Sequence, residues 1–242
     1  MSRKYKNPPI SEAICAFQFG QDSSWDFTVP GLVYEKVQTI FPKRSQIARV
    51  TVGILPDGEE IAQQLVPVMR FSSEDEKVLM QVGADFLSVN HLKPYSSWKT
   101  FLSLIQESFK VYLDVAKPES IQRIGLRYIN TIDVQHKNIN LEDYFEFRPY
   151  IGSRLPRTIG PFMMSVQLPY ENLRDVLNLR LISVAGISTE FATIILDLDY
   201  FTLQPKEVKL DDVFTWIETA HLHVEEAFEA SITDQLRQLF EG

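Results

Sequence analysis

Several residue types that usually announce a chemistry are scarce in this chain: its 242 residues include one cysteine, four histidines and ten glycines. The lone Cys15 can form no intrachain disulfide, and no Cys-x-x-Cys pair of the zinc-ribbon or redox type is present. Phosphate-binding glycine loops, the dinucleotide glycine fingerprint and the Gly-x-Ser-x-Gly elbow are also missing. These absences exclude the commonest nucleotide-hydrolysing, redox and serine-hydrolase classes, and we expect no cofactor. Enzymes that lack sequence-local motifs remain open.

The chain also has fewer basic than acidic residues, 24 Lys and Arg against 32 Asp and Glu. The formal net charge is −8, which argues against non-specific binding to nucleic acid or to an anionic membrane, because both depend on clustered Lys and Arg. No run of about 18 apolar residues could span a bilayer, and the first residues lack the apolar segment of a secretory signal. We therefore expect a cytoplasmic protein with no membrane partner.

What is present is the composition of a globular protein with a sizeable core, with 45% hydrophobic and 23% charged residues. In the first half, alternating apolar residues predict a strand over 10–19, in which Cys15 is a small core residue. Pro30 at a first helical position introduces a short amphipathic helix that runs to Phe41. Further strands are predicted near 47–55, 65–72, 77–83 and 85–91, before a long helix that Ser97 caps.

The second half repeats this order of elements. A strand over 122–132 and a short acidic helix over 141–145 precede strands near 162–169, 176–186 and 190–203. A helical region over 210–240 follows, in which Ser231 or Thr233 caps a separate terminal turn. The pattern predicts an α+β fold, with an antiparallel sheet and long helices packed on one face. It suggests pseudo-duplicated halves, 1–118 and 119–242, in one compact unit.

One candidate site is a pair of carboxylates. Asp197 and Asp199 alternate on a predicted strand and therefore share a face. Two adjacent carboxylates could bind a divalent cation, or one could have a raised pKa suited to general acid work. The alternative is a polar outer face of the sheet, on which cross-strand cations such as Arg180 balance the two aspartates.

A second candidate site is basic. Arg123 and Arg127 project from one face of their predicted strand, and Glu12 of the first strand is a natural partner for them. Two arginines on one face can bind a phosphate or carboxylate bidentately, which predicts a ligand site. A structural lattice of ion pairs is the alternative. A third hypothesis is specific nucleic-acid binding through a local basic patch such as Arg148, Arg154 and Arg157, which the acidic total charge makes the least favoured.

The C-terminal helical region is a candidate interaction helix, marked by Trp216, His221 and Glu225. His221 and His223 are about 200° apart around a helix, so they cannot share a metal ion. His221 and Glu225 lie four residues apart on one face and could act together, although an ordinary solvated face is the alternative. Trp216 is expected to pack between helix and sheet.

Several stretches together resemble a known family. They are Tyr5–Ile10 with Glu12–Cys15, Pro30–Leu32, Leu87–Asn90 with Pro94, Tyr95 and Trp98, Arg123–Asn130, and Ala220–His221 with Phe228 and Ser231–Thr233. The chain resembles the sporadically distributed, uncharacterised prokaryotic proteins of similar length. The resemblance implies no activity, cofactor or catalytic residue. Sporadic occurrence implies horizontal transfer, and with it a place in mobile defence, toxin-antitoxin or CRISPR-associated systems.

The sequence therefore favours a non-enzymatic interaction, adaptor or regulatory protein. Its partner is expected to be another protein, encoded nearby, and its oligomeric state is not indicated. The alternative is a small-molecule-binding, anion-binding or metal-dependent enzyme module that uses the Arg/Glu or the Asp/Asp site. Convergence of those side chains in space distinguishes the two hypotheses.

Overall fold

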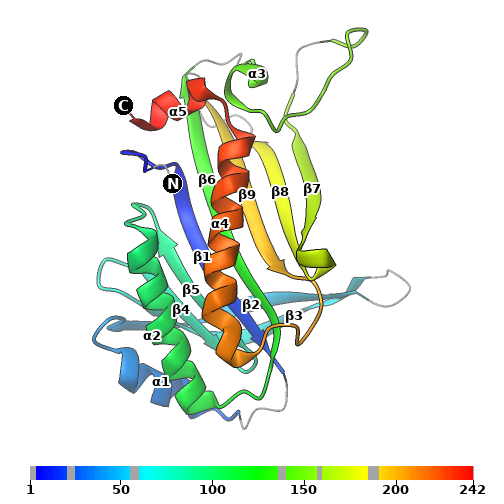
Figure 1. Ribbon diagram of the computed structural model, residues 1–242. Coiled ribbons are helices and arrows are strands. Elements are labelled where there is room, and N and C mark those ends of the chain that lie inside the picture. The colour runs from blue at the N-terminus through cyan, green and yellow to red at the C-terminus, as the bar shows by residue number, and fades with distance from the viewer. Residues whose placement is uncertain are drawn as a thin grey trace. The chain divides into compact units, whose positions relative to one another are not determined.

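The computed structural model describes residues 4–20, 25–54, 60–135, 140–156, 160–184 and 191–241. Within these residues, nine strands form an antiparallel sheet in the order β2-β3-β4-β5-β1-β6-β9-β8-β7 (Figure 1). Together with the helices this sheet confirms the predicted α+β class. No helix in the described part of the chain is both long and apolar enough to cross a membrane.

The chain divides into two compact units. Unit 1 comprises residues 1–14, 92–95 and 125–242, and unit 2 comprises residues 15–91 and 96–124. The strands β1 (Ile10–Phe19) and β6 (Ile121–Gln135) each contribute to both units. The two predicted halves, 1–118 and 119–242, stay a prediction.

Unit 2 contains the predicted strands and helices of the first half. The apolar side chains of its long helix α2 recur at helical spacing and are buried. The ring of Phe17 on β1 lies 4.8 Å from that of Phe109, and the ring of Phe19 lies 4.8 Å from that of Tyr112. Helix α2 spans Trp98–Ala116. The other elements of unit 2 are α1 (Val29–Val37), β2 (Lys43–Ile54), β3 (Glu60–Ser72), β4 (Val78–Gly83) and β5 (Phe86–Leu92).

Three sequence predictions in unit 2 can be compared with the structure in detail. Ser97 caps α2 as predicted, because its hydroxyl accepts a hydrogen bond of 3.2 Å from the backbone N–H of Thr100. Cys15 is fully buried, and burial raises the pKa of its thiol, as expected for a core cysteine. Helix α1 ends at Val37 rather than at Phe41, which is buried beyond the end of the helix and so extends the apolar pattern.

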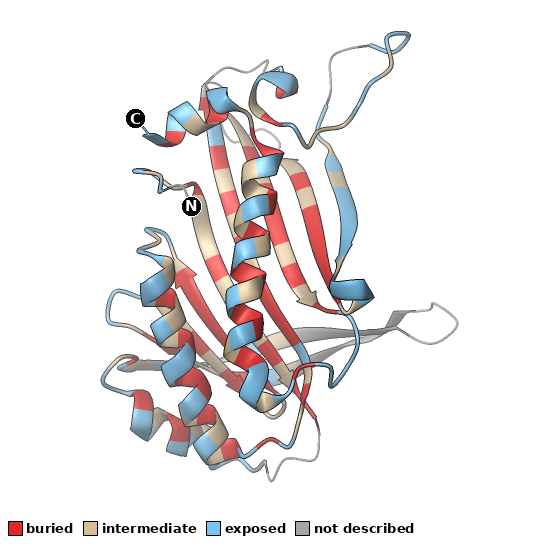
Figure 2. Cartoon of the chain, in the orientation of Figure 1, coloured by how far each residue is buried: buried red, intermediate tan, exposed pale blue. Residues whose placement is uncertain are grey.

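Unit 1 places one long helix against the sheet. Helix α4 (Val213–Ser231) lies on β9 (Phe191–Thr202), whose Leu196, Leu198 and Tyr200 are fully buried (Figure 2). Because alternate strand residues face opposite sides, the odd-numbered residues of β9 point away from this helix. The unit also contains α3 (Leu141–Tyr144), β7 (Met163–Tyr170), the 3₁₀ turns η1 (Glu171–Leu173) and η2 (Leu210–Asp212), β8 (Asp175–Val184) and α5 (Asp234–Glu241).

The predicted C-terminal helical region is divided as expected. Helix α4 ends at Ser231, and α5 begins at Asp234. The Thr233 hydroxyl accepts a hydrogen bond of 3.3 Å from the backbone N–H of Leu236, so Thr233 is the capping residue of the terminal helix.

Candidate functional site

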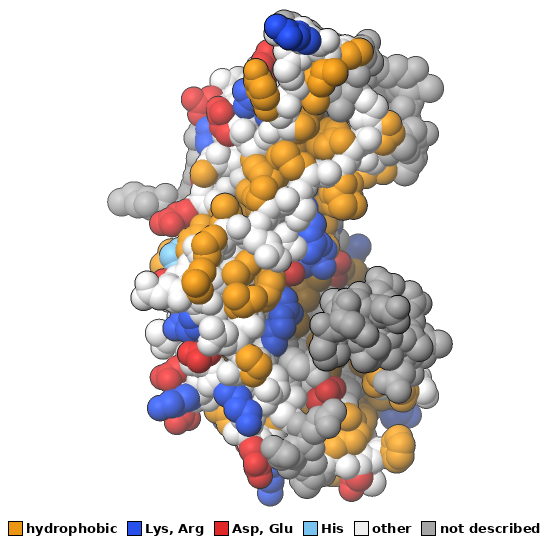
Figure 3. All heavy atoms as spheres, turned by 90° about the vertical axis from the view of Figure 1, so that its right-hand side faces the viewer, with side chains coloured by type: hydrophobic (Ala, Val, Ile, Leu, Met, Phe, Trp, Pro, Cys, Tyr) orange, Lys and Arg blue, Asp and Glu red, His pale blue; other side chains and the backbone are white. Residues whose placement is uncertain are grey.

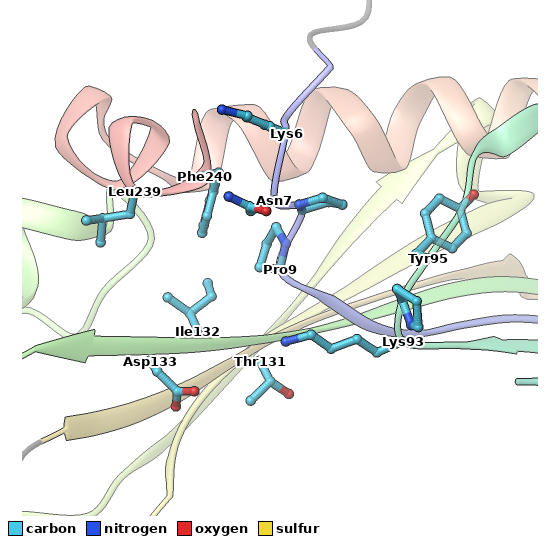
Figure 4. A pocket seen from close by; sticks show the side chains of 12 residues that line it. Lys6, Asn7, Pro9, Lys93, Tyr95, Thr131, Ile132, Asp133, Leu239 and Phe240 are labelled. Atoms are coloured by element: carbon cyan, nitrogen blue, oxygen red, sulfur yellow. The ribbon is translucent and has the colours of Figure 1, made fainter. Parts of the chain in front are cut away.

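Unit 1 contains a pocket of about 390 Å³. Four segments that are distant in sequence form its walls (Figure 4). Backbone hydrogen bonds join these segments: the Asn7 N–H donates to the Phe240 carbonyl (2.8 Å), and the Thr131 N–H to the Pro9 carbonyl (3.0 Å). The lining residues are Lys6, Asn7, Pro8, Pro9, Lys93, Pro94, Tyr95, Thr131, Ile132, Asp133, Leu239 and Phe240.

The N-terminal wall of the pocket is fixed by Tyr5. Its hydroxyl donates a hydrogen bond of 2.6 Å to the Glu229 carboxylate on α4, and its ring packs edge-on against Phe240 at 5.3 Å. Arg237 of α5 donates to the other oxygen of Glu229 at 2.9 Å. The segment before β1 is therefore held against both C-terminal helices. The pocket wall formed by residues 6–9 is therefore anchored to α4 and α5 through Tyr5.

A chain of polar side chains leads from this pocket to α4. The hydroxyls of Tyr95 and Tyr128 lie 3.3 Å apart, and the Tyr128 hydroxyl lies 3.4 Å from Nδ1 of His221. On the far side of the imidazole, Nε2 of His221 lies 3.4 Å from a carboxylate oxygen of Glu225. Since Tyr95 lines the pocket, this Tyr-Tyr-His-Glu chain connects the pocket wall with the middle of α4.

Tyr95 and His221 are both uncharged near neutral pH, and burial strengthens this preference for the neutral form. It lowers the pKa of His221 to about 4 and raises the pKa of Tyr95 to about 12. A neutral imidazole donates from one nitrogen and accepts at the other, so it can join the Tyr128 hydroxyl to the Glu225 carboxylate. The arrangement fixes the orientation of the Tyr95 side chain, whose hydroxyl faces Tyr128 and points away from the other labelled lining residues in Figure 4.

The structure also shows where the predicted carboxylate pair lies. Asp197 is buried and accepts two hydrogen bonds from Arg127, at 2.7 and 2.8 Å. Arg180 donates a third at 3.2 Å from the neighbouring strand. Asp197 and Asp199 share the face of β9 that points away from α4, because alternate residues of a strand point to the same side. Their partners on β8 are Arg180 and Asn178. In the described part of the chain there is no group of three or more His, Cys, Asp or Glu that could hold a metal ion.

The predicted ligand site and the predicted metal site are therefore in contact. The bidentate hydrogen bond that Arg127 donates to Asp197 is the first cause of the raised pKa of Arg127, and the charges of Asp199 and Glu12 contribute as well. Arg123 is exposed and belongs to unit 2, whereas Glu12 and Arg127 belong to unit 1. This mixed-charge cluster has the form of the structural ion-pair alternative, and a ligand or metal role for it stays a prediction.

The side chains that mark the candidate interaction helix point largely into the unit. Trp216 is 4% exposed, and His221 is buried. The Glu225 side chain is partly exposed. Leu222 lies on the outer face of α4 and is 58% exposed. In the basic loop, Arg148 donates to the Phe145 carbonyl at 2.9 Å, and Arg157 lies outside the described residues.

A fully buried carboxylate was not expected from the sequence. Asp175, at the start of β8, is 0% exposed and accepts hydrogen bonds from the Tyr200 hydroxyl and the Trp216 indole, both at 3.1 Å. The Arg174 guanidinium also donates to the Asp175 carboxylate, at 2.6 Å. The preceding turn, Glu171–Leu173, has φ between 47° and 70°, a conformation that non-glycine residues hold only with support from the surrounding structure. The Asp175 network lies next to this turn and gives that support.

An apolar surface lies along the sheet edge formed by β7. Met163 is 71% exposed, Leu168 39% and Val166 37%, and the eight residues of the strand include no charged side chain. Figure 3, which looks onto this side, shows hydrophobic side chains gathered there. We define the apolar edge as the exposed large hydrophobic residues of β7 and of the turn η1 that follows it: Met163, Val166, Leu168 and Leu173.

Sequence reasoning missed both the pocket and the apolar edge. The pocket residues Lys6, Lys93 and Tyr95 come from separate segments, and only the resemblance to a family draws attention to Tyr5–Ile10 and Pro94–Tyr95. For the edge a signal was available, because Met163–Tyr170 is an uncharged strand with a proline near its end. Comparison of the chain with protein-family models and with curated proteins found no match in either case.

Proposed function

We propose that the chain is a non-enzymatic cytoplasmic interaction protein that binds an extended segment of a partner protein along β7. The observation that carries the proposal is the apolar edge. Of the twelve exposed large hydrophobic residues among the described residues, four lie on β7 or in the turn that follows it. This concentration favours one interaction surface over scattered exposure.

The position of these residues favours strand addition as the binding mode. β7 is the last strand in the order of the sheet, and among the described strands it pairs only with β8. An edge strand presents unpaired backbone N–H and C=O groups, and proteins usually protect such edges with charges, particularly lysine. β7 has none. An added strand would pair with this backbone while its alternate side chains contact Val166 and Leu168.

The strand order supports a further part of the proposal, that the chain is a pseudo-duplication with helices on one face of the sheet. In each half the first strand lies beside the last one, β1 beside β5 and β6 beside β9. Each half also runs strand, helix, antiparallel strands, helix. The halves differ in the number of later strands, β2–β5 against β7–β9. From the family resemblance we further propose that the partner belongs to a mobile defence, toxin-antitoxin or CRISPR-associated system.

The test is a variant that charges the edge strand. Tagged protein is co-expressed with its genomic neighbours, and the mass of the purified assembly is measured. We expect a stoichiometric partner that is lost from Val166→Lys/Leu168→Lys and retained by Leu222→Lys, an exposed leucine on α4. Since all three side chains are more than a third exposed, the variants should fold.

Three results would overturn the proposal. One is a partner that remains bound to the doubly charged variant. Another is a partner that Leu222→Lys releases equally well. The third is a wild-type homodimer that the edge variant dissociates, because the occupant of β7 would then be a second copy rather than another protein.

A further inference from the structure

The pocket of unit 1 has a charge that contrasts with that of the whole chain. Its lining contains two lysines, Lys6 and Lys93, and one acid, Asp133, so the lining carries one net positive charge, whereas the chain carries −8. Asp133 accepts a hydrogen bond of 2.6 Å from the Thr193 hydroxyl. Neither lysine has an ion-pair or hydrogen-bond partner for its ammonium group among the described residues. The cations thus remain available to an incoming group.

The remainder of the lining combines apolar side chains with those of Asn7, Tyr95 and Thr131. Pro8, Pro9 and Pro94 form one part of it, and Ile132, Leu239 and Phe240 another. In Figure 4, the side chains of Lys6 and Lys93 lie on opposite sides of Asn7 and Pro9. A ligand in this pocket would meet one ammonium group at its charged end, and proline and aromatic carbon along its body.

We infer that this pocket binds a small organic monoanion, a carboxylate on an apolar body. The single net positive charge of the lining matches one carboxylate better than a phosphate dianion. Lysine binds anions as a point charge, and the lining has no arginine to bind phosphate bidentately. The volume of about 390 Å³ lies at the small end of the range for ligand pockets. Asn7 and Thr131 are further polar residues in the lining.

The experiment uses two probes that differ only in charge. 4-Phenylbutyrate and its neutral amide, 4-phenylbutanamide, are titrated into the full chain, and binding is followed by ligand-observed NMR. We expect the carboxylate to bind at least tenfold more tightly than the amide, a difference of about 1.4 kcal/mol. Lys6→Gln/Lys93→Gln should abolish this preference, whereas Lys209→Gln, an exposed lysine of unit 1 outside the pocket lining, should leave it unchanged.

Each contrary result overturns the inference. Equal binding of acid and amide would remove the role of charge. A preference that survives Lys6→Gln/Lys93→Gln would place the anion elsewhere, and inorganic phosphate that displaces phenylbutyrate at equal concentration would contradict the carboxylate class. The melting temperature of the double variant checks that it folds. The pocket lining contains no residue of β7, so this inference and the proposed function fail or hold independently.

Discussion

The buried carboxylate of Asp175 offers a quantitative test of how unit 1 is stabilised. Asp175 is fully buried and accepts from two neutral donors, Tyr200 and Trp216, and from the Arg174 guanidinium. In Asp175→Asn the side chain keeps one acceptor oxygen and gains an amide that faces donors. One of the neutral donors therefore loses its acceptor, which costs about 1–3 kcal/mol for a buried group.

The arginine adds less than its short contact suggests. The Arg174 side chain is 34% exposed, so water replaces part of the lost interaction, and we add no more than about 1 kcal/mol for it. We expect Asp175→Asn to lower the free energy of unfolding by about 1–4 kcal/mol. Urea unfolding followed by tryptophan fluorescence measures this change, because the Trp216 indole donates to Asp175 directly.

Asp211→Asn is the matched control, since Asp211 is exposed in the same unit and should change stability by less than about 0.5 kcal/mol. The reasoning is refuted if the two variants unfold at the same urea concentration. Such a result would mean that the Asp175 network contributes no more to stability than a surface acid.

Two further predictions concern the other polar groups of unit 1. Burial lowers the pKa of His221 from 6.5 to about 4, so the unfolded chain binds the proton more readily. Stability is then full above pH 6.5 and is lost as pH falls toward 4, by about 2 kcal/mol at pH 5. His221→Gln should lose correspondingly less between pH 7 and pH 5 in urea unfolding, and an equal loss would contradict the assignment. For Arg127 and Asp197, a double-mutant cycle of Arg127→Gln and Asp197→Asn should give a coupling energy of about 1–3 kcal/mol. Additive effects would show that their bidentate contact is not stabilising.

The fold could be predicted from the sequence wherever period and capping agreed. Ser97 and Thr233 cap their helices as expected, and Cys15 is a core residue. The prediction was weaker at the edge strand β2, which begins at Lys43, before the apolar pattern does. An edge strand needs little apolar character to pair, so its polar first residues gave no signal. At Phe41 the apolar pattern predicted too long an element. Phe41 is buried but lies beyond the end of helix α1.

The candidate sites were harder to predict because the sequence shows which charges share a strand but not which strands are neighbours. Arg127 and Asp197 were assigned to two different sites, yet β6 and β9 are adjacent and these side chains bind each other. The Asp175 network was missed for the same reason, because its donors Tyr200 and Trp216 lie 25 and 41 residues away in sequence. Pairings of this kind depend on strand order, which periodicity does not reveal.

The charged groups that bind one another also indicate where function should be sought. Arg127 with Asp197, and Arg174 with Asp175, satisfy each other within the fold. A ligand that displaced either pair would have to replace a charge-assisted hydrogen bond and leave a buried carboxylate without its cation, at a cost of several kcal/mol. Lys6 and Lys93 impose no such cost, because their ammonium groups bind no described residue, and the apolar edge has no covering element on the described chain. Ligand and partner binding are therefore expected at these surfaces rather than at the sites with the most conspicuous charged residues.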